Sequence, residues 1–326
     1  MYAIFSLLFG FSCYIQHHNE EKRGGDFRLR FAWRMLLLFL WGMLDLMFFN
    51  GDILVVYAVL GLLLIPLMKA KDKVLWLLAG VLLLQPIELG YLVAAQFCPE
   101  VKPMDVGLGT LWGELASACA HGSILDVAKV NWAYGLQINF GWALENGRLT
   151  QTLLLFIVGM LLGRKRLFIN EGSHLFTWKK VLIGSVVTFA VTQLLVLYVP
   201  ASIESPTMKH SANILFSAWR NLSMTIFYVS GLSLLYYKTG LHHAIDQLKY
   251  LGKMSLTNYL IQSIVGGFIF YNWGLSLYSM ATHGYSFLFA VVFLVPLYFF
   301  CRYWSTHFRR GPLEEIWYRL TWIGRK

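Results

Sequence analysis

Basic residues alternate along this chain: they crowd every second gap between its apolar segments and are scarce in the other gaps. Of the 27 Lys and Arg residues, 22 lie in one set of gaps and four in the other, while Arg220 lies inside an apolar segment. A helix needs about 20 residues to cross a hydrocarbon layer of about 30 Å, and most of the apolar segments approach that length. The alternation therefore predicts a chain that crosses a membrane repeatedly.

Nine apolar segments make up this pattern. With 57% hydrophobic and only 13% charged residues, the composition excludes a water-soluble domain of 326 residues. We predict an all-α, polytopic integral membrane protein with about nine transmembrane helices, formed as a single transmembrane domain over residues 1–326. The segments are Tyr2–Ile15, Phe31–Phe49, Ile53–Met68, Val74–Phe97, Thr150–Leu162, Lys180–Val199, Asn213–Tyr237, Leu256–Trp273 and Tyr285–Trp304.

The basic gaps also predict an orientation. Short loops rich in Lys and Arg stay in the cytoplasm, so the C-terminal tail, which ends in Arg325 and Lys326, is expected inside and the N-terminus outside. Membrane insertion then accounts for the net charge of +10, and no nucleic-acid partner is predicted. Because Tyr2–Ile15 is short for a span and follows no basic residue, a preceding helix is expected to be missing. A late start, a truncated gene and a short first span are the three explanations.

The longest gap, residues 98–148, is predicted to be an outer loop or lid. Apolar side chains recur in it at helical spacing, which indicates either a helix on the bilayer surface or ordinary loop packing. Cys98 and Cys119 both lie in this segment, where an oxidising exterior would permit a disulfide bridge. The recurring residues are Leu108, Leu111, Trp112, Leu115 and Ala118.

A second short helix is predicted over residues 311–322, at the inner membrane interface. Gly311-Pro312 is a typical helix start, and Glu314 and Glu315 in the first turn complement the helix dipole. Tryptophans suit an interfacial position, and two of them, Trp317 and Trp322, follow in this segment.

Polar residues inside the apolar segments are the main functional candidates, because a charge at the centre of a spanning helix costs roughly 2.5 to 3.5 kcal/mol. Asp45, Asp52, Glu88 and Arg220 all fall in the half of the membrane that is predicted to be outer. Glu88 and Arg220 fall at matching depths, which indicates a structural ion pair, snorkelling of the side chains to the outer membrane surface, or a polar cavity that binds substrate. Pro86 is expected to open the helix before Glu88 and to free a backbone carbonyl.

Four blocks of sequence resemble the YeiB-like bacterial inner-membrane proteins, which carry the domain of unknown function 418. The similarity covers essentially the whole chain, and the last two blocks are the most specific. Family members begin with one more helix, which bears an L-D-x-x-R-G type motif. The blocks are Phe5–Gly10, the helix Arg34–Gly42 leading into Gly51–Leu54 and Tyr57-Ala58, the run Gly252–Ser263, and Gly311–Glu314.

The resemblance implies a function. The family is similar to transmembrane acyltransferases, including heparan-alpha-glucosaminide acetyltransferase and the acyltransferase-3 proteins, so it implies transfer of an acyl group from a cytoplasmic acyl-CoA such as acetyl-CoA to a cell-envelope sugar. It also implies a place in the bacterial inner (plasma) membrane. Where the resemblance leads us to expect a histidine, in the span before Gly51–Leu54, this chain has Asp45. This residue, together with the first helix that is expected to be missing, is a departure from the family pattern.

In this scheme Asp45 or Asp52 would orient or deprotonate the acceptor hydroxyl, and Arg220 would hold an anionic group or the developing oxyanion. Asn258 and Gln262 would line the path of the thioester donor, and Glu88 and Asn221 would line the polar cavity. No metal ligand set and no tightly bound cofactor are predicted. A secondary transporter, to which a proline-broken helix with a buried acid is equally suited, and a non-catalytic partner subunit are the alternatives.

Overall fold

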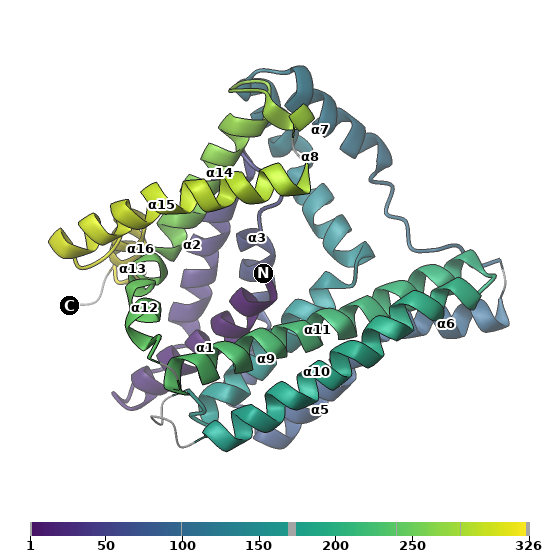
Figure 1. Cartoon of the computed structure of the whole chain (residues 1–326), viewed down its shortest axis with the longest axis horizontal. Coiled ribbons are helices and arrows are strands. Elements are labelled where there is room, and N and C mark those ends of the chain that lie inside the picture. The colour runs from purple at the N-terminus through teal and green to yellow at the C-terminus, as the bar shows by residue number, and fades with distance from the viewer. Residues whose placement is uncertain (1, 99, 169–173, 239, 281, 324–326) are drawn as a thin grey trace. The chain divides into compact units, whose positions relative to one another are not determined.

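The computed structural model describes residues 2–98, 100–168, 174–238, 240–280 and 282–323, and these form helices and loops without a strand (Figure 1). The all-α prediction is therefore confirmed for the described residues, whereas Arg325 and Lys326 of the basic tail lie outside them. The α-helices are α1 Tyr2–Glu21, α2 Arg28–Leu46, α3 Leu54–Leu62, α4 Leu64–Leu67, α5 Asp72–Leu83, α6 Pro86–Phe97, α7 Gly109–His121, α8 Ile124–Glu145, α9 Arg148–Arg164, α10 Leu175–Tyr198, α11 Pro206–Lys238, α12 His242–Gln247, α13 Lys249–Lys253, α14 Ser255–Phe270, α15 His283–His307 and α16 Pro312–Thr321, and two 3₁₀ turns are η1 Pro200–Ser202 and η2 Leu277–Met280.

Two helical segments among the described residues, Leu175–Ser202 and Gly284–His307, are long and apolar enough to cross a membrane. The number rises to four if the bent pairs α5 with α6 and α8 with α9 each count as one span. Only 11% of the residues in the apolar window of either long segment are buried, so their apolar side chains face outward, as lipid-facing helices require. The predicted segment Ile53–Met68 instead forms α3 and α4, of 9 and 4 residues. The count of about nine spans and the orientation stay predictions.

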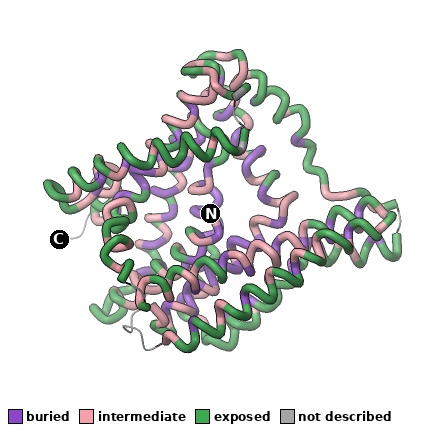
Figure 2. The backbone as a smooth tube through the Cα atoms, in the orientation of Figure 1, coloured by how far each residue is buried: buried purple, intermediate pink, exposed green. Residues whose placement is uncertain are grey.

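The chain divides into two compact units, which we describe separately. Unit 1 comprises Met1–Ala32, Val56–Val106 and Gly141–Gly240, and unit 2 comprises Trp33–Val55, Gly107–Phe140 and Leu241–Lys326. In unit 1, α10 and α11 run side by side, while α1 packs against α9 (Figure 1). Helix α9 is buried along most of its length and forms the centre of this unit (Figure 2).

Glycines allow α1 and α9 to approach closely. A Cβ atom added at Gly10 of α1 would collide with the backbone of Phe156 on α9, and one added at Gly159 would collide with the backbone of Leu7. Gly159 and Gly163 form a G-x-x-x-G pair on the face that meets α1, the spacing by which apolar helices pack at short distance. The rings of Phe9 and Phe156 stack beside this contact with their centroids 4.5 Å apart. Small side chains therefore decide the packing at the centre of unit 1.

The helix break predicted at Pro86 is confirmed. Helices α5 and α6 meet at 46°, and Gln85 between them adopts a left-handed backbone conformation with φ 50°. Pro86 is the first residue of α6, where its missing N–H group leaves no helical hydrogen bond unmade. The carbonyl of Leu83, at the end of α5, accepts a hydrogen bond of 2.7 Å from the indole N–H of Trp219. A side chain from α11 thus takes the place of the lost helical partner.

In unit 2, helix α16 packs against the start of α14. The carboxylate of Glu314 accepts hydrogen bonds from the backbone N–H (2.9 Å) and the hydroxyl (2.6 Å) of Thr257. The indole of Trp33 on α2 donates to the carbonyl of Leu320, and Arg34 lies over the ring of Trp317. The helix predicted within residues 311–322 is therefore present as α16, and it packs against α2 and α14. Its interfacial position stays a prediction.

Candidate functional site

The turn between α2 and α3 carries the first of two buried carboxyl groups. Asp52 is 1% exposed, and its two carboxylate oxygens accept hydrogen bonds from the backbone N–H groups of Leu54 (3.1 Å) and Val55 (2.9 Å). An aspartate before the first turn of a helix is a favoured cap because it satisfies N–H groups that lack a helical partner. This capping interaction holds the Asp52 side chain in one orientation. Helix α2 also approaches it closely, since a Cβ atom added at Gly42 would lie 2.9 Å from Asp52 Oδ2.

Asp45, in the last turn of α2, carries the second carboxyl group. It is 1% exposed and lies within hydrogen-bonding reach of the Asp52 carboxyl group. Its Oδ2 accepts a hydrogen bond of 3.1 Å from Ser263, while its Oδ1 accepts none from a described residue. Neither carboxyl group forms an ion pair with a described residue. Two buried carboxyl groups in contact, with no cation beside them, can hold a proton between them.

Helix α14 supplies the hydroxyl groups that meet this pair. Tyr259 donates a hydrogen bond of 3.2 Å to Asp52 Oδ1 and accepts one of 3.0 Å from the backbone N–H of Ile53. Tyr259 and Ser263 are four residues apart, so they lie on the same face of α14. The site thus joins the α2–α3 turn to the middle of α14.

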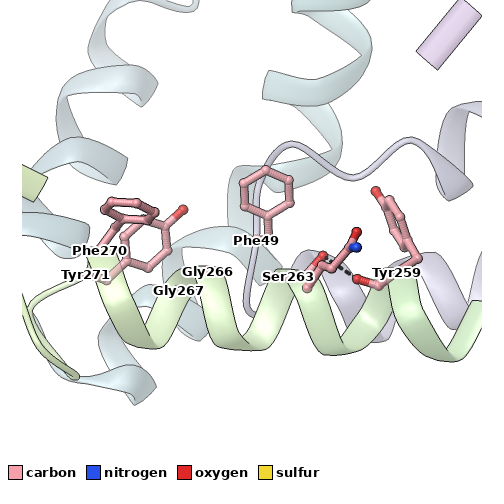
Figure 3. Close-up of a pocket in the computed structure, with 8 residues that line it drawn as sticks. Phe49, Tyr259, Ser263, Gly266, Gly267, Phe270 and Tyr271 are labelled. Carbon is pink, nitrogen blue, oxygen red and sulfur yellow. Dashed lines mark hydrogen bonds between the residues drawn. The ribbon is translucent and has the colours of Figure 1, made fainter. Parts of the chain in front are cut away.

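Tyr259 and Ser263, which contact this pair, also line a pocket of about 300 Å³ (Figure 3). Gln262 lines it as well, and most of the pocket surface is apolar. The wall is completed by aromatic side chains and two glycines, namely Phe49, Phe270, Tyr271, Gly266 and Gly267. An aromatic wall beside polar groups is suited to a ring that carries hydroxyl groups, because the ring faces stack while the hydroxyl groups form hydrogen bonds.

Asparagines of α8 support the turn from another side. Asn139 donates through its amide to the carbonyls of Asp52 and, at 3.2 Å, of Asn50. The amide of Asn50 in turn donates to Asn131 Oδ1 at 3.2 Å. All three asparagines are buried. This network fixes the backbone on both sides of Gly51, so the Asp52 carboxyl group is carried by a rigid turn.

The structure brings three of the predicted site residues, Asp45, Asp52 and Gln262, to this one place. Asn258, predicted to line the same path, instead uses its side chain in packing: its amide donates to the carbonyl of Leu251 (2.9 Å) and its oxygen accepts from the Cys301 thiol (3.0 Å). Asn258 precedes Gln262 by one helical turn, yet its partners belong to α13 and α15. This interaction stabilises the helix packing of unit 2.

Glu88, Arg220 and Asn221 lie in unit 1. Glu88 is 2% exposed and has Ser211 of α11 as a hydrogen-bond partner, whereas its Oε1 has none among the described residues. No ion pair joins Glu88 to Arg220 in the described part of the chain, so the ion-pair interpretation is wrong. The reason is geometric: Arg220 follows Ser211 by nine residues, which places it on the opposite side of α11.

Sequence reasoning missed a polar cluster in unit 1. Arg148, at the start of α9, donates to the Tyr2 hydroxyl (2.8 Å) and to Gln151 Oε1 (3.0 Å), and Tyr2 donates to the same oxygen at 2.5 Å. Beside them the hydroxyls of Ser6 and Tyr57 lie 2.6 Å apart, and Tyr57 donates to the Tyr2 carbonyl. The only sequence signal was an arginine at the edge of an apolar segment.

All four cysteines are free in the structure. The bridge considered between Cys98 of unit 1 and Cys119 of unit 2 stays a prediction. Cys119 lies on α7, which occupies part of the segment where the apolar spacing indicated a helix. Its neighbour is Tyr271, the residue after α14. The lid role of residues 98–148 stays a prediction.

The fold and the outward-facing apolar helices define a helical protein with helices of membrane-spanning length, and a buried carboxyl pair marks its candidate site. The family described as "Protein of unknown function (DUF418)" matches residues 162–324, and the chain belongs to that family. This confirms the resemblance to the YeiB-like proteins.

Three relatives extend the comparison. The chain is 27% identical to the uncharacterized protein YxaH of Bacillus subtilis over 98% of this chain and 78% of the relative. It is 40% identical to an uncharacterized 39.9 kDa protein encoded in the amylase 3' region of Bacillus acidopullulyticus, over 22% of this chain and 21% of the relative. It is 34% identical to the uncharacterized protein YeiB of Escherichia coli over 22% of this chain and 18% of the relative. No solved structure matches the chain significantly.

Proposed function

We propose that this protein is a multi-pass acyltransferase of the bacterial inner (plasma) membrane, which transfers an acyl group from a cytoplasmic acyl-CoA to a hydroxyl group of a cell-envelope sugar. The observation that carries the proposal is the Asp45 and Asp52 carboxyl pair, in contact with each other and with two hydroxyl groups beside a pocket with an aromatic wall. The family resemblance supplies the reaction class.

In this proposal the sugar lies in the pocket against Phe49 and Tyr271, and Gln262 hydrogen-bonds one of its hydroxyl groups. The reacting hydroxyl gives its proton to the carboxyl pair as its oxygen attacks the thioester carbonyl carbon. The C–O bond forms and the C–S bond breaks, and the thiolate that leaves takes up the proton from the pair. Tyr259 and Ser263 hold the carboxylates in position through the exchange.

The donor would bind through its phosphates, and unit 2 offers basic residues near the start of α14. Lys249 and Lys253 lie on α13, which directly precedes that helix. Lysine ammonium groups bind phosphates as point charges, so donor binding is expected to weaken as salt is raised. Asn258, whose side chain is engaged in helix packing, has no part in donor binding in this proposal.

The test is transfer of labelled acetyl from acetyl-CoA to envelope glycan in membrane vesicles that contain the full chain. Replacing a general base should lower the rate about 10² to 10⁴-fold, so Asp45→Asn and Asp52→Asn should both lose transfer. Asn at position 52 still caps α3, which separates loss of charge from loss of folding. Glu114→Gln, an exposed carboxyl-to-amide change on α7, is the matched control and should retain full activity. Equal transfer by all four proteins would contradict the proposal.

A secondary transporter is the second candidate, and the break between α5 and α6 favours it. Transporters bind substrate at discontinuous helices, and here a 46° break precedes the buried carboxyl group of Glu88. In that case Glu88→Gln would abolish ion-driven uptake in vesicles, and acetyl-CoA would neither bind nor raise the melting temperature of the protein.

A further inference from the structure

Unit 1 contains a second and larger cavity, of about 460 Å³. Helices α1, α5, α9, α10 and α11 all contribute to its wall, which is almost entirely apolar. One of its few polar groups, the hydroxyl of Thr225, already donates to the carbonyl of Asn221 at 2.8 Å. Such a cavity offers little to orient a polar solute and is suited to a hydrocarbon chain.

One end of the cavity is basic. Leu162 and Leu167 line it from the end of α9, and Thr177 and Trp178 line it from the start of α10. The connecting stretch, residues 164–180, carries five Lys or Arg residues and one acid, Glu171, which lies outside the described residues.

One lysine of this stretch contacts a residue that lines the cavity. The ammonium group of Lys165 lies 5.2 Å from the ring centroid of Trp76, a lining residue. Arg164 is held by Asp72 at 2.6 Å, whereas Lys165, Arg166, Lys179 and Lys180 form no ion pair with any described residue. We take Lys165, with Lys179 and Lys180, which directly follow the lining residues Thr177 and Trp178, as the groups at this end that can meet an anion.

We propose that this cavity binds one acyl chain of an anionic membrane phospholipid, with its phosphate at Lys165, Lys179 and Lys180. Its volume is roughly three times that of the ~150 Å³ cavity known to hold a benzene ring, which leaves room for on the order of 15 to 20 carbon atoms. This lipid site is independent of the acyl transfer assigned to unit 2.

Head-group charge decides the selectivity of this site. A chain gains little by moving from bilayer to cavity, because the bilayer is equally apolar. Discrimination must then come from the phosphate, and each lysine near an anionic head group strengthens binding about fivefold. Phosphatidylglycerol should therefore bind better than phosphatidylcholine with the same chains, and salt should reduce the difference.

Two glycines give a matched test of the cavity. A Cβ atom added at Gly80 of α5 or at Gly184 of α10 meets no atom within 4 Å, but only Gly80 lines the cavity. Phosphatidylglycerol should raise the melting temperature of the detergent-solubilised wild type and of Gly184→Phe. Gly80→Phe fills the cavity and should bind the lipid about tenfold more weakly. A Gly80→Phe protein that responds like the wild type would overturn the proposal.

The lysines are tested separately. The combined variant K165Q/K179Q/K180Q should respond equally to phosphatidylglycerol and phosphatidylcholine, while wild-type protein prefers the former. If wild type shows no preference, the lipid is merely part of the bilayer around the protein and the proposal fails.

A measurement on the unaltered chain covers the case in which a variant does not fold. Phosphatidylglycerol with a photoreactive group in its acyl chain should label peptides containing Leu154–Leu162 and Leu222–Val229, both of which line the cavity. Labelling confined to the outward faces of α10 and α15 would overturn the proposal.

Discussion

One buried polar cluster in unit 1 and one in unit 2 are built in opposite ways. In unit 1 the Arg148 guanidinium, the Tyr2 hydroxyl and the Gln151 amide satisfy one another, and Gln151 also donates to the carbonyl of Ala218. In unit 2 the Asp45 and Asp52 carboxyl groups lie in contact although both carry the same charge when ionised. The first arrangement stabilises a helix interface, while the second is costly to stability and persists beside a pocket.

This difference gives a criterion for function that burial alone does not provide. Buried polar groups that satisfy each other's hydrogen bonds are accounted for by a structural role. Two buried carboxyl groups that are held together despite their repulsion instead indicate a binding or catalytic role. Substitutions in the polar cluster of unit 1 should therefore lower stability, whereas substitutions in the carboxyl pair of unit 2 should lower activity and leave stability unchanged or higher.

The largest effect is expected at the centre of unit 1. Gly10→Ala places a methyl group against the backbone of Phe156, which cannot move aside as a flexible side chain would. We expect a loss of about 3 kcal/mol in unfolding free energy, seen as a lower melting temperature in detergent. Gly90→Ala on α6, where an added Cβ meets nothing within 4 Å, is the control and should be neutral or slightly stabilising. The reverse ranking would contradict the packing described here.

The second largest loss of stability is expected in the polar cluster of unit 1. Arg148→Gln removes the guanidinium that donates to both Tyr2 and Gln151, and we expect it to cost about 2 kcal/mol because a charged donor is lost from two hydrogen bonds. Lys209→Gln, at an exposed position on α11, should leave the melting temperature unchanged. Equal melting temperatures for the two variants would remove the structural role assigned to Arg148.

The carboxyl pair of unit 2 should behave in the opposite way. Asp45→Asn keeps the contact with Ser263 and turns a like-charged pair into an amide that can donate to Asp52. We expect stability to stay level or to rise by about 1 kcal/mol, while acyl transfer is lost. A drop in melting temperature as large as that of Arg148→Gln would place Asp45 among the structural polar groups.

The smallest effect concerns Glu88 and Arg220. Since Ser211, the partner of Glu88, and Arg220 lie on opposite sides of α11, the effects of Glu88→Gln and Arg220→Gln should add within about 0.5 kcal/mol in the double variant. A larger coupling energy, measured by thermal denaturation of the three variants, would show that the two residues interact after all.

Local features of the fold were predictable from sequence. The break at Pro86 and the helix start at Pro312 follow from backbone chemistry that needs no distant partner. Family membership could also be predicted from the sequence. The blocks Gly252–Ser263 and Gly311–Glu314, which carried the resemblance, fall inside residues 162–324, which the family matches. The two blocks meet in the structure, where Glu314 binds Thr257.

The partners of the buried polar groups were decided only by the tertiary structure. Asp45 contacts Ser263 across 218 positions and Asp52 contacts Tyr259 across 207. Helical spacing shows which residues share a face, as Tyr259 and Ser263 do, but it leaves open which helix that face meets. Depth along a helix likewise suggested Glu88 and Arg220 as a pair, whereas rotation about the axis of α11 turned Ser211 toward Glu88 instead. A sequence therefore fixes how far each charge lies along its helix, and only packing settles the direction in which it points.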